Sequence, residues 1–224
     1  MPNAPEVTKN INHFFKESYT LQNDPAKLAA HYRSWADAYD IDVALEAYQG
    51  PSVVASILDT LDRAYGRVGR SDLRVLDAGC GTGLVGMELS SLGFPKIDGI
   101  DLSGDMIDKA RKTGKYASLS SGVDMNVGLT DVPTAAYDVT VCCGVFTPGH
   151  VKPAALGELI RVTKPNGMIV ISARKSFAEA GGLQAVIDRF IVERQITMVF
   201  QLQDAHYVVD ERACYWALSV LPRQ

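Results

Sequence analysis

The chain has 224 residues, of which 47% are hydrophobic and 21% charged, and this fits one α/β domain with a small appendage or two very small domains. The net charge of −4, with no run of Lys or Arg longer than two, argues against a nucleic-acid or anionic membrane partner. No stretch approaches the roughly 18 apolar residues that span a bilayer.

The cysteines carry no metal-site spacing. Cys80, Cys142, Cys143 and Cys214 form no Cys-x-x-Cys pair, so we expect reduced thiols and no bound metal. The segment Met1–Glu6 lacks the basic end and apolar run of a secretory signal. We therefore expect a cytoplasmic protein and leave its oligomeric state open.

The first 65 residues predict helices. Asp24 followed by Pro25 is typical of an N-cap and a first-turn proline. An apolar stripe then recurs at helical spacing, and a second stripe runs from residue 53 to 65 after a Gly-Pro break. We interpret residues 1–65 as a helical cap or lid on a core formed by residues 66–224. The first stripe comprises Leu28, Tyr32, Trp35 and Tyr39.

From residue 73 to 173, predicted strands alternate with predicted helices, which indicates a parallel sheet covered on both faces. Glycines and prolines separate these elements. The predicted strands are Leu73–Ala78, Lys96–Leu102, Ser118–Val123, Ala136–Val145 and Met168–Ala173.

The tail departs from this alternation. One more helix is predicted over Leu183–Ile191. Ile196–Leu202 and Cys214–Leu221 then read as strands, with a loop and a short His206–Val209 run between them. Two late strands without a helix between them predict a hairpin that closes one edge of the sheet.

A glycine turn after the first predicted strand carries the chemistry. Gly81–Gly86 fits Gly-x-Gly-x-x-Gly, which leaves a nicotinamide or flavin dinucleotide possible. Asp77, however, ends the strand beside the helix N-terminus that would hold a pyrophosphate, and its charge would repel phosphates. It favours a cationic ligand without phosphate, such as S-adenosylmethionine (SAM); alternatively, Asp77 only caps the turn.

Two residues further along extend the predicted cofactor site. Asp101 ends the second strand, where a carboxylate accepts both ribose hydroxyls in dinucleotide and SAM proteins alike. Met106 follows on the next helix and packs either on an adenine face or in the core.

Four motifs resemble those of class I SAM-dependent methyltransferases, in order and at plausible spacing. They are Val75–Gly83, Gly99–Ser103, Tyr137–Cys142 and Arg161–Gly167. The closest resemblance is to the methyltransferase-like family linked to the Williams–Beuren chromosomal region. The runs Trp35–Asp40 and Thr147–Val151, together with Arg161–Gly167, carry that second resemblance.

The resemblance implies a Rossmann-like seven-stranded sheet with helices on both faces and an antiparallel hairpin at one edge. It implies that the glycine turn lines the methionine part of SAM and that Asp101 and Leu102 hold the ribose and adenine. Asp124, with Met125 beside it, is the candidate for the adenine amino group, and Cys142 and Cys143 lie at a strand end beside the cofactor. The turn residues are Asp77, Ala78, Gly79, Cys80, Gly81 and Gly83.

The acceptor side is less strongly specified. A base is needed only if the acceptor arrives protonated, and His150, in the loop after the fourth strand, is the first candidate. His31 and Tyr39 on the cap are further candidates, and an ordinary loop histidine is the alternative for His150. Tyr32, Trp35 and Phe146 are expected to line the substrate pocket, and Trp35 and Tyr39 to shield the sulfonium.

These observations predict a SAM-dependent methyltransferase that acts on a small molecule by in-line displacement. One alternative is a SAM-binding enzyme of the same fold that catalyses a cyclisation, decarboxylation or other non-methylating reaction. Others are an NAD-type oxidoreductase and a catalytically silent protein whose core serves association. The substrate and the modified atom are left open.

Overall fold

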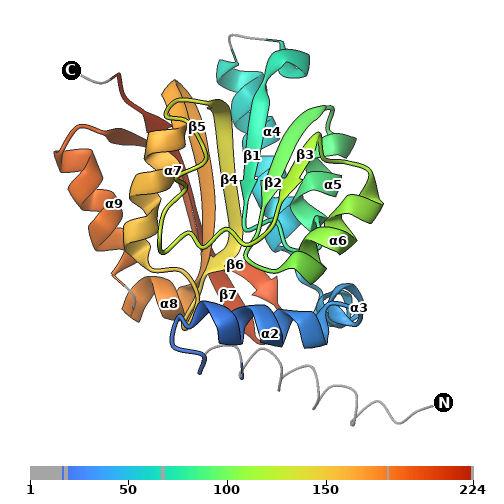
Figure 1. Ribbon diagram of the computed structural model, residues 1–224. Coiled ribbons are helices and arrows are strands. Elements are labelled where there is room, and N and C mark those ends of the chain that lie inside the picture. The colour runs from blue at the N-terminus through green and yellow to red at the C-terminus, as the bar shows by residue number, and fades with distance from the viewer. Residues whose placement is uncertain (1–16, 18–19, 67–68, 181, 223–224) are drawn as a thin grey trace.

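The computed structural model describes residues 17, 20–66, 69–180 and 182–222. Its centre is a seven-stranded sheet in the order β3-β2-β1-β4-β5-β7-β6 (Figure 1). The strands are β1 (Arg74–Ala78), β2 (Lys96–Ile100), β3 (Ser118–Ser120), β4 (Tyr137–Phe146), β5 (Thr163–Arg174), β6 (Ile196–Val208) and β7 (Glu211–Val220).

Strands β1 to β5 pair in parallel, and β7 enters antiparallel between β5 and β6. The predicted parallel sheet with an antiparallel hairpin at one edge is therefore confirmed. The hairpin differs in detail, because β6 continues through the predicted loop and reaches β7 by a two-residue connection. Register shifts along the β6–β7 pair accommodate this length without ending the strand.

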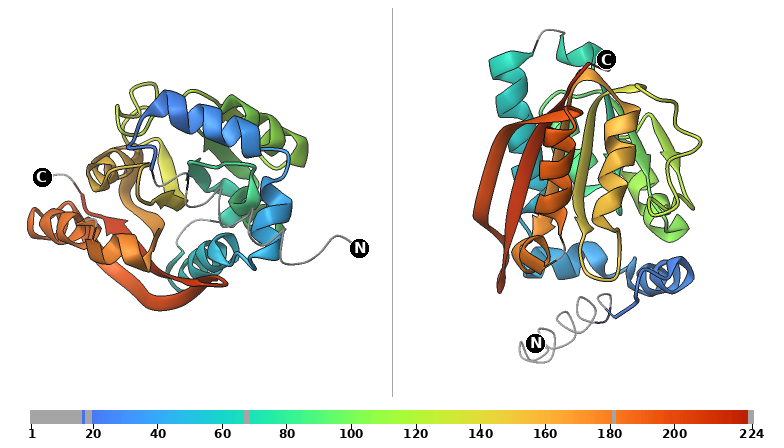
Figure 2. Two further views of the ribbon diagram at one scale, coloured as in Figure 1. Left: turned by 90° about the horizontal axis from the view of Figure 1, so that it is seen from below. Right: turned by 90° about the vertical axis from the view of Figure 1, so that its left-hand side faces the viewer.

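Helices cover both faces of the sheet, as Figure 2 shows. One apolar cluster joins α4 and α5 to one face, and another joins α7 and α9 to the opposite face. Because α4 packs on the sheet, it forms part of the core layer although it falls within the predicted cap segment. These helices are α4 (Gly50–Tyr65), α5 (Leu84–Ser91), α6 (Gly104–Thr113), α7 (Leu156–Val162), α8 (Lys175–Ala180) and α9 (Leu183–Val192).

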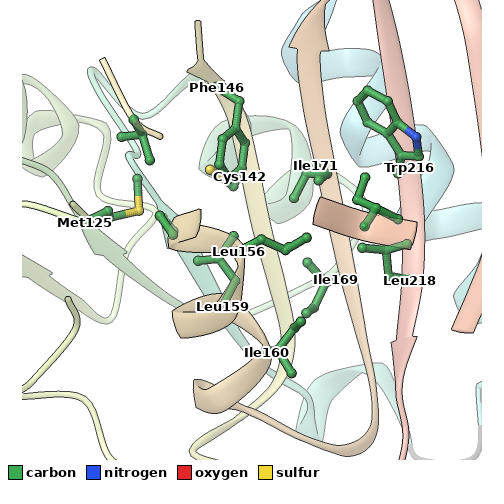
Figure 3. Packing of buried hydrophobic residues seen from close by; sticks show 14 of the residues in the cluster. Met125, Cys142, Phe146, Leu156, Leu159, Ile160, Ile169, Ile171, Trp216 and Leu218 are labelled. Atoms are coloured by element: carbon green, nitrogen blue, oxygen red, sulfur yellow. The ribbon is translucent and has the colours of Figure 1, made fainter. Parts of the chain in front are cut away.

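The core explains why β4 and its neighbours read as continuous apolar runs. Leu156, Leu159 and Ile160 of α7 lie against Ile169 and Ile171 of β5 (Figure 3). Trp216 and Leu218 continue this packing onto β7. In the part of the chain that the structure covers, no helix combines the length and the apolar composition needed to cross a membrane.

Two helices lie across one end of the sheet instead of on a face. These are α2 (Pro25–Trp35) and α3 (Tyr39–Leu45), seen below the strands in Figure 1. The Asp24 side chain accepts hydrogen bonds from the first-turn amides of Ala26 and Lys27, which confirms the predicted N-cap. Since β1 and β2 end beneath α2, this arrangement encloses space at the carboxyl edge of the parallel strands.

Candidate functional site

A cavity lies at the carboxyl edge of the sheet, roofed by α2. Its walls come from the turns after β1 and β2, the loop after β3 and the end of β4. This is the edge at which open α/β folds bind their ligands. The lining residues are Leu28, Ala29, Tyr32, Tyr39, Gly79, Gly81, Asp101, Leu102, Ser103, Met106, Val123, Asp124, Met125, Asn126, Cys143, Gly144, Val145, His150 and Val151.

The turn after β1 depends on glycine for two reasons. Gly79 has a φ of +74°, and a Cβ there would lie 2.4 Å from a methyl carbon of Val145. A Cβ on Gly81, also at positive φ, would meet nothing within 4 Å. The turn therefore packs tightly against β4 at Gly79 and leaves open space for a ligand at Gly81.

Asp101 joins the two turns that form the floor. One carboxylate oxygen accepts the amide of Gly81 at 2.9 Å, and the other accepts the amide of Ser103 at 2.8 Å. Burial raises the pKa of this carboxyl, while these backbone amides act to lower it. Each oxygen retains a further lone pair, so the carboxylate can also accept two hydroxyls of a ligand.

The charge of the lining is one-sided. It includes the carboxylates Asp101 and Asp124, and no Lys or Arg occurs among the described lining residues. A pyrophosphate would need cations or free helix-terminal amides at this position. The lining is suited to a ligand that is cationic and rich in hydroxyls.

Asp77 lies beneath the turn. Its side chain is fully buried, and Tyr116 donates to one oxygen at 2.7 Å, while the other oxygen has no hydrogen-bond partner. Burial raises the pKa of Asp77 to about 7, the Tyr116 hydrogen bond opposes this shift, and the charge of Asp101 adds to it. The carboxyl is thus next to the cavity floor without lining it.

The roof contacts the loop after β4 through His150. The Tyr32 hydroxyl lies 2.8 Å from Nε2 of His150, and Nδ1 of His150 lies 2.9 Å from the carbonyl oxygen of Pro148. Asn23, just before α2, donates its side-chain amide to the carbonyl of His150 at 2.5 Å. Both ends of this contact therefore belong to the cavity wall.

Many predicted site residues are brought together at this cavity, although their individual roles stay predictions. The predicted turn, ribose and adenine positions meet the predicted acceptor residues across the same space. Those that line it are Gly79, Gly81, Asp101, Leu102, Met106, Asp124, Met125, Cys143, His150, Tyr39 and Tyr32.

Cys142 and Phe146 are corrections. Both side chains lie in the apolar cluster between β4 and α7, with exposed fractions of 0% and 1% (Figure 3). Adjacent residues of a strand face opposite sides, so Cys143 reaches the cavity and Cys142 does not. Phe146 therefore stabilises the core and is not a pocket wall.

Trp35 and His31 also differ from prediction. Trp35 is buried, donates its indole N–H to Asp42 at 2.7 Å, and packs edge-on against Tyr39. His31 is buried beside Glu17, with Nδ1 at 3.8 Å from the carboxylate. These two side chains stabilise the roof from behind instead of facing the cavity.

The remaining predicted turn residues act through the fold. Ala78 is buried in the core of the sheet, and Cys80 packs against Ile107 of α6. Gly83 ends the turn at a φ of +99°, and a Cβ there would press on Tyr116 and α6. None of these residues lines the cavity.

Several lining residues were absent from the sequence prediction. Leu28 lies one turn before Tyr32, so the helical stripe itself contained the signal. Asn126 comes from an irregular loop, and its contact with the carbonyl of His150, at 2.9 Å, has no local signature. The others are Ala29, Ser103, Val123, Gly144, Val145 and Val151.

Comparison with known proteins agrees with this geometry. Residues 75–167 match the family described as a methyltransferase domain. A TehB-like SAM-dependent methyltransferase from Corynebacterium glutamicum superposes with a TM-score of 0.60 at 20% identity, covering 85% of this chain and 98% of that one. The magnesium protoporphyrin IX methyltransferase of Synechocystis, solved with bound SAH, gives 0.54 at 16% identity over 76% and 82% of the two chains.

The chain therefore belongs to the class I SAM-dependent methyltransferases, whose cofactor is SAM. It is 34% identical over 173 residues to methyltransferase-like protein 27 of Homo sapiens, a match that covers 74% of this chain and 66% of that protein. A ubiquinone biosynthesis O-methyltransferase from Rickettsia akari is 30% identical over 123 residues, or 54% of this chain. The match thus spans just under two thirds of the human protein and 48% of the bacterial one.

Proposed function

We propose that this protein transfers the methyl group of SAM to a small-molecule acceptor in the cavity beneath α2. The observation that carries the proposal is the enclosed cavity in which the glycine turn and Asp101 face Tyr32 and His150. One half has the charge and backbone geometry for SAM, and the other half offers the polar groups that an acceptor needs. Both halves line one space.

The described residues fit the cofactor. Gly81 leaves open space where an amide can approach a carboxylate, and Asp101 retains acceptor capacity for ribose hydroxyls. Met106, Leu102 and Met125 supply apolar surface for an adenine, with Asp124 available to its amino group. When bound, SAM supplies an electrophilic methyl carbon on a good leaving group.

The protein's own contribution is alignment and exclusion of water. Tyr32 and Leu28 project from α2 onto the cavity, so the roof restricts access of solvent to the reacting atoms. Asp40 at the start of α3 accepts a hydrogen bond from Thr82 in the glycine turn at 2.6 Å, which ties the roof to the floor. Tyr39 lies beside this contact and is placed to face a sulfonium.

The relatives support a small acceptor. The names of two of them describe O-methyltransferases of ubiquinone biosynthesis and of malonyl-[acyl-carrier protein], the latter from Serratia marcescens and 34% identical over 115 residues. A roofed cavity suits a small molecule or the end of a longer one better than an open groove would.

Calorimetric titration with SAM and with NADH tests the cofactor assignment. We expect saturable SAM binding and none for NADH, because the described lining carries two carboxylates and no cation. NADH binding without SAM binding would contradict the proposal.

A non-methylating SAM reaction remains the alternative reading of the same site. Mass spectrometry of a turnover mixture separates the two, since methyl transfer must produce S-adenosylhomocysteine in step with product. Product without S-adenosylhomocysteine would favour the alternative.

A further inference from the structure

His150 is held as a neutral base. A carbonyl oxygen only accepts hydrogen bonds, so the contact with Pro148 at 2.9 Å places the ring proton on Nδ1. In the neutral ring Nε2 is then an acceptor, and the Tyr32 hydroxyl, 2.8 Å away, donates to it. Burial lowers the pKa of His150 to about 4, and the neighbouring His31 and Arg174 lower it further.

The histidine is also fixed in position. Its carbonyl accepts the side-chain amides of Asn23 and Asn126, at 2.5 and 2.9 Å, and the amide of Asn23 donates to the carbonyl of Gly149 at 2.9 Å. These residues come from the segment before α2 and from the loop after β3. The imidazole is therefore oriented by contacts on two sides of the cavity.

Tyr32 completes a directed chain of hydrogen bonds. Because its proton points to Nε2, the lone pairs of the tyrosine oxygen remain able to accept a proton from a third group. Tyr32 and His150 both line the cavity, so that third group is a molecule bound there. A hydroxyl donor in the cavity would extend the chain to three members.

We propose that Tyr32 and His150 form a proton relay, and that the acceptor of this protein is a hydroxyl compound methylated on oxygen. This inference rests on the proposed methyl transfer. The acceptor oxygen bonds to the methyl carbon as the bond from that carbon to sulfur breaks, and S-adenosylhomocysteine leaves. The acceptor proton passes to the Tyr32 oxygen while the Tyr32 proton passes to Nε2 of His150, which becomes an imidazolium.

The relay discriminates among acceptor classes. A carboxylate is already ionised at neutral pH and has no proton to give, and a neutral amine attacks through its lone pair before it loses a proton. A hydroxyl needs a base at the moment of attack. The apolar side chains of Leu28, Val145 and Val151 share the cavity, which suits a hydroxyl carried on an apolar frame.

The relay also links chemistry to the position of α2. Tyr32 belongs to α2, whereas His150 belongs to the loop after β4. The relay is complete only while α2 lies over the cavity. Proton removal is therefore confined to the closed arrangement, in which water is excluded.

Catechol, benzoate and aniline are matched probes, since they present a hydroxyl, a carboxylate and an amine on the same ring. The fourth probe is 4-nitrocatechol, whose more acidic hydroxyl ionises near neutral pH without help. Methyl transfer from isotopically labelled SAM is measured by mass spectrometry for each probe. We expect methyl ethers from the two catechols and no methyl benzoate or N-methylaniline.

His150→Gln and Tyr32→Phe test the relay itself. Loss of a general base costs about 10²- to 10⁴-fold in rate. We expect His150→Gln to lose that much on catechol and far less on 4-nitrocatechol, with Tyr32→Phe changing in the same direction by a smaller factor. His206→Gln and Tyr65→Phe, both at exposed positions away from the cavity, are the matched controls.

The comparison of the two catechols separates base loss from general damage. Equal losses on catechol and 4-nitrocatechol would assign His150 a structural role and overturn the relay. Transfer to benzoate or aniline in preference to the catechols, or SAM binding without transfer to either catechol, would overturn the hydroxyl acceptor and leave the cofactor assignment intact. Failure to bind SAM would overturn the proposed function itself.

Discussion

The two halves of the cavity are built in different ways. The floor comes from contiguous motifs, in which Gly79, Gly81 and Asp101 lie at strand ends and bond to each other's backbone. The roof and the acceptor side join residues far apart in sequence, such as Tyr32 and His150, which are separated by 118 positions. The floor is thus encoded locally, whereas the acceptor side exists only after the chain has folded.

The first prediction concerns a residue that separates core from cavity. Phe146→Ala should cost about 3–5 kcal/mol of unfolding free energy, because a fully packed aromatic ring leaves a void against α7. SAM affinity of the folded protein should not change, since the side chain does not line the cavity. Denaturant titration and calorimetry measure the two quantities.

Phe146→Leu is the milder variant for that experiment, and it should show a smaller stability loss with unchanged affinity. A pocket wall would give the opposite pattern. Weakened SAM or acceptor binding with near-normal stability would restore the original sequence prediction for Phe146.

The second prediction is a pH dependence that originates beneath the floor. The unfolded chain releases the Asp77 proton near pH 4, whereas the folded chain keeps it until about pH 7. The unfolding free energy should therefore fall as pH rises through this window, by up to about 4 kcal/mol from this group. Asp77→Asn removes the titration, so its stability curve should be flatter between pH 4 and 7.

Denaturant titrations of wild type and Asp77→Asn at pH 5 and pH 8 provide the measurement. The variant should gain stability relative to wild type at pH 8, where the buried carboxylate is ionised. An unchanged difference between the two proteins at both pH values would show that Asp77 keeps an ordinary pKa in the folded state.

The third prediction concerns Asp101. Its two oxygens accept two different amides, so Asp101→Asn keeps the shape of the side chain but loses one acceptor and the charge. Loss of such a bond costs about 1.5–3 kcal/mol, and SAM binding should weaken by roughly 10- to 100-fold. Asp108→Asn is the matched control on α6, because that carboxylate is exposed and pairs with Arg111.

The smallest effect is expected at the rim of the roof. Arg33 on α2 pairs with Asp105, and Lys109 on α6 pairs with Asp37, and both pairs reach solvent. Exposed ion pairs contribute little, so Arg33→Gln with Lys109→Gln should change SAM affinity by less than about fivefold. Stopped-flow fluorescence should show faster SAM dissociation, and high salt should reproduce this effect in wild type.

The difference between floor and roof also explains what sequence could predict. The sheet, its hairpin and the floor residues Gly79, Gly81 and Asp101 follow from strand ends, glycine spacing and capping, all of which are local. The predictions failed where the facing of a side chain mattered. Cys142 and Phe146 were placed in the site because they lie near the end of β4, yet strand alternation turns both into the core.

The contacts of the acceptor side could not have been predicted. His150 was a candidate because of its loop, but the carbonyl of Pro148 that fixes its tautomer and the hydroxyl of Tyr32 that occupies Nε2 are properties of the folded chain. The contact of Asn126 with the same loop is equally non-local. Such pairs require the relative positions of α2 and the loop after β4, which no local pattern contains.

A crystal structure with S-adenosylhomocysteine tests most directly the claim that cofactor and acceptor share the cavity beneath α2. The account predicts the ribose hydroxyls on Asp101, the amino-acid end beside Gly79 and Gly81, and the sulfur facing the side of the cavity that holds Tyr32 and His150. S-adenosylhomocysteine bound elsewhere, or bound with its sulfur turned away from Tyr32 and His150, would contradict it.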